Sequence, residues 1–284
     1  MSAFPGHTGR FAPSPTGRLH LGHAYSALLA HDAARAAGGR FLLRIEDIDQ
    51  GRCRPAYIDA ILDDLAWLGV SWDAPPIRQS TRLTAYAEAL DTLRQAGLLY
   101  PCFCTRKDIA IEIAQADRAP HGPEGALYPG TCRRLDPGRR QALLDSGRPH
   151  AWRLDTARAV DRAGGPLDWH DAGAGTVSAD PLSLGDVVLA RKDVPTSYHL
   201  AVVVDDAAQG VSHIVRGEDL FHATHMHRLL QALLGHTPPA YAHHPLICGA
   251  DGQRLAKRDA AMTLAEWRAA GYGPGAVRDR LGLA

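Results

Sequence analysis

The first fifty residues alternate between short apolar runs and one long helical stretch. Residues 9–12 form a brief β-like run, and residues 20–37 are rich in Ala and Leu, as is typical of a helix, and stop at Gly38 and Gly39. Residues 41–45 (FLLRI) are a candidate buried strand. A strand, a helix and a strand of this length form a βαβ unit, so we expect an α/β fold with a parallel sheet.

The rest of the chain extends this pattern but interrupts it once. Helical spacing recurs over residues 56–69, 80–97 and about 222–234, and strand-like or apolar segments lie at 187–190, 197–204 and 211–215. Residues from about 100 to 184 are rich in Gly, Pro and Arg and have few periodic segments. We therefore predict that residues 101–184 are inserted into an α/β domain made of residues 1–100 and 185–260, with a short helical remnant at 261–284.

Composition excludes several classes of protein. The 284 residues are 45% hydrophobic and 22% charged, which is ordinary for a globular protein. Lys plus Arg and Asp plus Glu both number 31, so the chain is not a polycation, although a local basic face remains possible. Its apolar runs are too short to span a bilayer, and no signal peptide is visible. Five cysteines fit a cytoplasmic enzyme with a metal site better than a disulfide scaffold.

The segment PSPTGRLHLGH, residues 13–23, combines a rigid turn with two histidines at the start of the first helix. Two prolines exclude regular structure before the helix. The helix N-terminus offers unpaired N–H donors to a phosphate, and His20 and His23, three residues apart, share one helix face. Gly22 leaves room for a flat ligand. Taken alone, two histidines at this spacing are more often surface residues on a Pro-rich turn, and only the surrounding sequence favours a phosphate site.

Two other groups of residues are candidates for binding a phosphate or a metal ion. Lys257, in the cationic segment QRLAKRD, suits a mobile clamp on a polyphosphate, although such a loop is usually only solvated surface. Cys102, Cys104 and Cys132 have a spacing that permits a zinc site, with Tyr128 or the rival ligand His121 completing it; three free thiols are the alternative. We expect the remaining histidine clusters to be solvated or packed, namely His222, His225, His227, His243 and His244.

These motifs together resemble a known family. Residues 13–23 resemble the HIGH signature of class I aminoacyl-tRNA synthetases, and the RLAKR loop resembles their KMSKS signature. The segments RFAPSPTG, RIEDID and VRGED narrow the resemblance, which spans residues 9–260, to the glutamate and glutamine branch. Only 25 residues follow Asp259, whereas glutamyl-tRNA synthetases continue into an anticodon-binding region. In this the chain is similar to the short branch that attaches glutamate to the queuosine base of tRNA(Asp).

The resemblance implies a doubly wound, Rossmann-like nucleotide-binding sheet with an inserted zinc-bearing subdomain, and it also implies roles for particular residues. A glutamate pocket is implied at Arg10, Ala12, Ser14, Glu46, Tyr198 and Arg216. The two arginines suit the side-chain carboxylate of glutamate and Glu46 suits its ammonium group. ATP, with Mg²⁺, is implied at His20, Gly22, His23 and Lys257. One structural Zn²⁺ per chain is implied at Cys102, Cys104, Tyr128 and Cys132.

The implied reaction has two steps. L-glutamate and ATP form glutamyl-adenylate without tRNA, and the glutamyl group then passes to queuosine in the anticodon loop of tRNA(Asp). We expect a monomer. Arg254 and Ala256 depart from the family signature, which has Lys and Ser there. Two alternatives stay open: a truncated glutamyl-tRNA synthetase that charges the 3′ end of tRNA(Glu), and a catalytically silent paralogue that binds nucleotides or RNA.

Overall fold

The first βαβ unit forms as the apolar pattern predicts. In the computed structural model, which describes residues 6–115, 121–123, 125–247 and 262–283, β1 (Thr8–Phe11) and β2 (Arg40–Ile45) are parallel neighbours and α1 (Leu21–Ala36) connects them. A short strand, β3 (Ile77–Arg78), pairs with the far end of β2, also in parallel. The expected α/β fold with a parallel sheet is therefore confirmed.

Strands from the second half of the chain continue this arrangement. Parallel strands β11 (His213–Gly217), β12 (Ala240–His244) and β8 (Asp168–Asp171) are joined by antiparallel β9 (Gly175–Ser178), in the order β11-β12-β8-β9. The Ser212 amide donates to the carbonyl of Thr8 at 3.0 Å, and this bond holds the start of β11 beside β1. Strands β8 and β9 belong to residues 101–184, so part of that segment joins the sheet of the second half.

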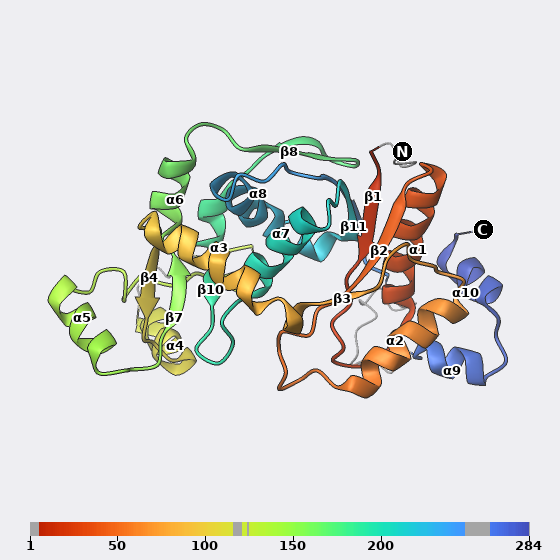
Figure 1. Ribbon diagram of the computed structural model, residues 1–284, viewed down its shortest axis with the longest axis horizontal. Helices are drawn as coiled ribbons and strands as arrows, with labels where there is room; N and C mark the ends of the chain where they lie inside the picture. The colour runs from red at the N-terminus through yellow and green to blue at the C-terminus, as the bar shows by residue number, and fades with distance from the viewer. Residues whose placement is uncertain (1–5, 116–120, 124, 248–261, 284) are drawn as a thin grey trace.

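A separate antiparallel sheet occupies the opposite end of the molecule (Figure 1). Its strands are β10 (Val188–Ala190), β7 (Ala151–Leu154) and β4 (Leu99–Cys102), in that order. Helices α4 (Arg106–Gln115) and α5 (Pro137–Asp145) lie beside it, with the two-residue strands β5 (His121–Gly122) and β6 (Gly125–Ala126). This region holds the cysteines that the sequence singled out.

The other helices agree with the helical spacing in the sequence. The helices predicted at 56–69, 80–97 and about 222–234 are α2 (Pro55–Trp67), α3 (Leu83–Gln95) and α8 (Ala223–Leu233). The apolar segment 197–204 begins a helix, α7 (Tyr198–Ala208). The remaining elements are α6 (Thr156–Ala163), α9 (Leu264–Ala269), α10 (Pro274–Leu281) and the 3-10 turns Gln79–Thr81, Pro181–Leu184 and Glu218–Leu220. None of the helices in the described ranges is long and apolar enough to cross a membrane.

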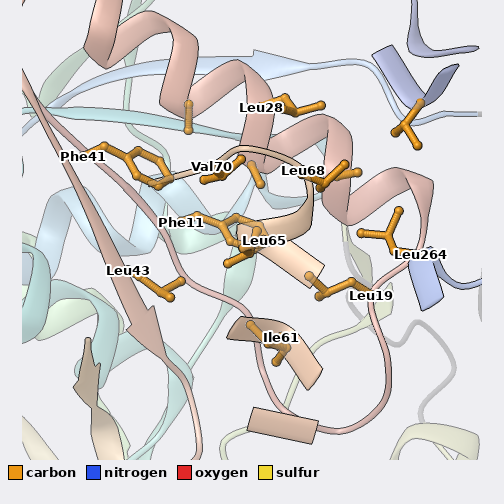
Figure 2. Close-up of a cluster of buried hydrophobic side chains, with 14 of the residues drawn as sticks. Phe11, Leu19, Leu28, Phe41, Leu43, Ile61, Leu65, Leu68, Val70 and Leu264 are labelled. Atoms are coloured by element: carbon orange, nitrogen blue, oxygen red, sulfur yellow. The ribbon is translucent and has the colours of Figure 1, made fainter. Parts of the chain in front are cut away.

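The core behind β1 and β2 connects both ends of the chain. Phe11 and Phe41 of the strands pack against Leu28 of α1 and Leu65 of α2, as Figure 2 shows. Leu264 of α9 joins the same cluster and is fully buried. Because burying each such side chain contributes about 1.5–3 kcal/mol, this cluster fixes the ends of β1, β2 and α1 in place.

Candidate functional site

A cavity of about 520 Å³ lies where β1, β2 and β11 end and α1 begins. This is the position at which open α/β sheets usually bind ligands. Nine of the residues that the sequence singled out line it: Arg10, Ala12, Ser14, His20, Gly22, His23, Glu46, Tyr198 and Arg216. Lys257, Arg254 and Ala256 lie outside the described residues.

The Pro-rich turn between β1 and α1 forms one wall of the cavity. The amide of Glu46 donates to the carbonyl of Pro13 at 3.0 Å, and the amide of Arg54 donates to Pro15 at 3.1 Å. Since proline has no N–H of its own, these carbonyl bonds tie the turn to the chain that follows β2. The turn therefore holds Ser14 and Glu46 on the same cavity.

His20 and His23 lie together at the start of α1. Their ring centroids are 3.9 Å apart. The Gly22 amide donates to Nδ1 of His20 at 3.1 Å, and the His20 amide donates to Nδ1 of His23 at 3.2 Å. A nitrogen that accepts a backbone N–H carries no proton, so each ring is neutral with its proton on Nε2. Both imidazoles can therefore donate a hydrogen bond to an anion in the cavity.

Glu46 belongs to a buried network of charges below the cavity. Arg44, whose side chain is fully buried, donates to Glu46 at 3.2 Å and to Asp206 of α7 at 2.7 Å. The Nε of Arg44 lies 3.9 Å from Asp205. Burial raises the pKa of Glu46, and the nearby cations Arg44 and Arg10 oppose that rise.

Arg10 has one charged partner. Its Nε donates to Asp206 at 3.2 Å, and its Nη1 reaches the carbonyl of Val215 at 3.5 Å. Arg10 therefore combines an ion pair with a position on the cavity wall.

Arg216 differs from Arg10 because its partners are neutral. It donates to Nε2 of His243 at 3.1 Å, to Oγ1 of Thr224 at 2.5 Å and to the carbonyl of Leu220 at 3.2 Å. Its Nη1 has only long contacts, 3.4 Å to Nδ1 of His227 and 3.5 Å to the Tyr198 hydroxyl. Across the part of the chain that the structure describes, no carboxylate pairs with Arg216, although its side chain is buried.

The histidines around Arg216 are kept neutral. Burial, and then the charge of Arg216, lower the pKa of His243 to about 4 and lower the pKa of His227 well below its usual value. Two histidines of α8, His225 and His227, are buried, which agrees with the expectation that the histidines of this helix are solvated or packed. Arg216 is thus a buried cation whose charge no side chain of the described residues neutralises.

The cysteine cluster is the second chemical grouping. Cys102, Cys104 and Cys132 place their sulfur atoms within 4.8 Å of one another, and the sulfurs of Cys104 and Cys132 are 3.4 Å apart. The Tyr128 hydroxyl lies 3.5 Å from the sulfur of Cys102 and 3.6 Å from that of Cys104. Sulfur ligands on tetrahedral zinc are about 3.8 Å apart, as follows from a bond of about 2.3 Å. The cluster can therefore hold a metal ion.

Hydrogen bonds favour the thiolate form of one cysteine in the cluster, Cys102. A bond from Cys132 lowers the pKa of the Cys102 thiol to about 4, while the pKa of Cys132 rises. The Phe103 amide donates to the sulfur of Cys132 at 3.3 Å, and the guanidinium of Arg153 lies 3.9 Å from the centre of the Tyr128 ring. Such neighbours orient metal ligands. His121 is the alternative fourth ligand that the sequence offers, and its side chain is not among those that the structure describes.

Sequence reasoning missed the residues behind the cavity wall. Arg44 stands in the RIEDID segment, but Asp205 and Asp206 were passed over although they form an acidic pair inside the apolar run AVVVDDAA. Charged residues in such a run are rarely buried unless paired, which is the signal that could have found them. Asp171 and His243 carried no comparable signal, since only the pairing of β8 with β12 brings them together.

Comparison with known proteins gives a consistent result. Residues 8–284 match the model of the family described as tRNA synthetases class I (E and Q), catalytic domain. A Rhodobacter capsulatus protein named glutamyl-Q tRNA(Asp) synthetase is 53% identical over 96% of this chain and 99% of its own length. A Nocardia farcinica protein of the same name is 49% identical over 98% of this chain and 86% of its own length.

Solved structures agree at the level of the fold. A crystal structure of a glutamate tRNA ligase from Elizabethkingia meningosepticum, in complex with its amino acid, superposes with a TM-score of 0.78 at 28% identity. A glutamate-tRNA synthetase from Elizabethkingia anophelis gives 0.79, also at 28% identity. Both matches cover 95% of this chain, which spans 59% of the length of either solved protein.

Proposed function

This chain belongs to the catalytic-domain family of class I tRNA synthetases for glutamate and glutamine, and on that premise we propose that it activates glutamate with ATP and transfers the glutamyl group to queuosine of tRNA(Asp). Relatives that are 41–53% identical carry the name of that activity. It is accordingly a ligase of the class I synthetase type. Its division into domains and the roles of its site residues are part of the proposal.

The charge balance at the buried end of the cavity carries the choice of glutamate. Three cations, Arg10, Arg44 and Arg82, face three carboxylates, Glu46, Asp205 and Asp206. Arg216 adds one positive charge, and none of the carboxylates that the structure describes pairs with it. Glutamate has two carboxylates and one ammonium group, so its net charge of −1 complements this excess. Neutral glutamine would leave Arg216 unpaired in a buried site, which is unfavourable.

The first step is the formation of a mixed anhydride. An oxygen of the glutamate α-carboxylate attacks the α-phosphorus of ATP, the bond to the bridging oxygen breaks, and pyrophosphate leaves. Negative charge develops on the phosphoryl oxygens, and His20 and His23 are positioned to donate to them from the start of α1. Mg²⁺ bound with ATP would help to neutralise the departing pyrophosphate.

Lys257 is the proposed cation at the mouth of the site. Leu246 and Ile247, just before the undescribed residues 248–261, line the cavity. Just after them, Thr263 forms a bridge with His20, and the amide of Leu264 donates to the carbonyl of Leu19 at 2.8 Å. Both flanks of this segment therefore lie beside the proposed ATP site, which supports a role for Lys257 there.

The proposed function is tested by exchange of labelled pyrophosphate into ATP. We expect exchange that depends on glutamate, needs no tRNA and is not supported by glutamine. The second step is tested with labelled glutamate and three RNAs: tRNA(Asp) with queuosine, tRNA(Asp) without it, and tRNA(Glu). Labelling of tRNA(Glu) alone would establish the truncated synthetase instead, and absence of exchange would favour a catalytically silent paralogue.

We propose that the metal of the cysteine cluster is one structural Zn²⁺ held by Cys102, Cys104, Tyr128 and Cys132. When bound, the ion would stabilise a region whose small core offers few other contacts. Cys102→Ser with Cys104→Ser should remove about one zinc per chain, as measured by metal analysis. Cys53→Ser is the control, because Cys53 lies outside the cluster. Unchanged zinc in the double variant would contradict the site.

A further inference from the structure

Asp171, on β8, is joined to Arg216 through a single imidazole. The Nδ1 of His243 lies 2.7 Å from Oδ2 of Asp171, and its Nε2 accepts the Nε–H of Arg216 at 3.1 Å. The side chains of Asp171 and His243 are each 3% exposed. Strand pairing aligns the three groups, because Arg216 and His243 are register partners on β11 and β12, and β8 is the next strand.

The hydrogen-bond chain has only one consistent direction. An arginine Nε–H can only donate, so Nε2 of His243 must be unprotonated. The ring proton is then on Nδ1, where it is donated to Asp171. The carboxylate of Asp171 is itself fixed, because its Oδ1 accepts the amides of Gly173 and Ala174 at 2.9 and 3.0 Å. A carboxylate that orients an imidazole in this way selects its tautomer.

We propose that Asp171 is a positioning residue for Arg216, which it orients through His243 so that the guanidinium presents Nη1 to the carboxylate of the bound amino acid. Neither Asp171 nor His243 lines the cavity, so both act through Arg216. The inference rests on the proposed function, which supplies the carboxylate. It also gives residues 101–184 a part in the amino-acid site, since β8 belongs to them.

The neighbours of Arg216 agree with this role. His227 accepts from Nη1 at 3.4 Å through Nδ1, and its Nε2 lies 3.3 Å from Nδ1 of His199, so this second imidazole is also a neutral acceptor. Burial and the charge of Arg216 lower the pKa of His199 to about 4. The guanidinium is thus oriented on two sides without losing its charge to a carboxylate, which preserves its affinity for an anionic ligand.

The test uses Asp171→Asn, which keeps the shape of the side chain and removes its charge. The amide can donate to His243 and favour the tautomer with a proton on Nε2, which would face the Nε–H of Arg216. We expect the dissociation constant and the KM for glutamate to rise about 10-fold or more, while the KM for ATP stays within about twofold. Asp168→Asn on the same strand is the matched control, because Asp168 is exposed, and it should leave both KM values unchanged.

A second measurement does not depend on activity. The ¹⁵N shifts of the His243 imidazole, assigned with His243→Gln, should show a protonated Nδ1 in the wild-type protein and lose that pattern in Asp171→Asn. A proton on Nε2 in the wild type, or glutamate affinity in Asp171→Asn within about twofold of wild type, would overturn the inference. If the wild-type protein binds no glutamate, the proposed function fails, whereas the tautomer still decides whether Asp171 orients His243.

Discussion

Two buried arginines close to the same cavity have opposite electrostatic surroundings. Arg44 is within ion-pair distance of three carboxylates, Glu46, Asp205 and Asp206. Arg216 contacts two imidazoles, two hydroxyl groups and one carbonyl, all of them neutral. Since an isolated buried charge is costly, Arg44 is explained by its protein partners, whereas the charge of Arg216 would be neutralised by the anionic substrate that we propose.

On the proposed function, this contrast separates a structural charge, that of Arg44, from a substrate-binding charge, that of Arg216. Arg44 aligns Glu46 and Asp206, and Asp206 in turn holds Arg10, so its network sets the shape of the pocket. Arg216 is held in place by acceptors that leave its charge available. The two arginines should therefore respond differently to the same substitution: one should lose stability and the other should lose substrate binding.

Arg216→Met should have the largest effect on activity. Loss of the unpaired cation leaves the substrate carboxylate buried without a partner, so kcat/KM for glutamate should fall about 100-fold or more. Folding stability should change less than in Arg44→Met, because Thr224 and His243 remain within hydrogen-bond distance of each other, 3.3 Å. Glutamate-dependent pyrophosphate exchange and urea unfolding measure the two effects.

Arg228→Met is a matched control for Arg216→Met, since Arg228, on α8, donates to the carbonyl of Asp168 and does not line the cavity. It should retain kcat/KM within about twofold, because an exposed interaction contributes about 1 kcal/mol or less. If Arg216→Met kept its affinity for glutamate but lost several kcal/mol of stability, Arg216 would be a structural charge and the contrast would be wrong.

Arg44→Met should have the largest effect on stability. The substitution leaves buried carboxylates without a cation, and breaking a buried ion pair in this way costs about 3–5 kcal/mol. Adding Asp206→Asn should recover part of the lost stability, because it removes one of the unpaired buried charges. A double-mutant cycle measured by urea unfolding gives the coupling energy. Arg35→Met, which breaks a partly exposed pair with Asp73, is the control and should cost about 1 kcal/mol or less. Equal losses in Arg44→Met and Arg35→Met would contradict a buried network.

The same contrast explains what the sequence could and could not predict. The helices and strands that carry the site follow from local pattern: α1 and β2 lie where apolar spacing and Gly38 place them. Most of the predicted site residues that line the cavity belong to short sequence motifs such as PSPTGRLHLGH. Resemblance to a family was therefore sufficient to name them before their arrangement was known.

The partners of these residues depend on tertiary pairing. Asp206 reaches Arg44 from 162 residues away, and Asp171 is 72 residues from His243. No local pattern encodes such contacts, so whether Arg10 and Arg216 are paired could not be decided from sequence. The bounds of the inserted subdomain could not be predicted for the same reason, because the Gly and Pro content of residues 101–184 does not reveal that β8 pairs with β12.

Acid should weaken the Arg44 network gradually, and this is the smallest of the expected effects. Burial alone would raise the pKa of Asp206, but Arg44 and Arg10 outweigh it and lower the pKa. A carboxyl group whose pKa is depressed by folding contributes stability above its unfolded pKa of about 3.9, and that contribution is lost as the pH falls through the folded pKa. The free energy of unfolding should therefore decline below about pH 4, with at most about 1.4 kcal/mol per pH unit from this group. In Asp206→Asn that part of the slope should disappear, measured by urea unfolding between about pH 3 and 6. An unchanged slope would mean that Asp206 is not the anion that Arg44 holds. The explanation of Arg44 as a structural charge paired with buried carboxylates would then be wrong.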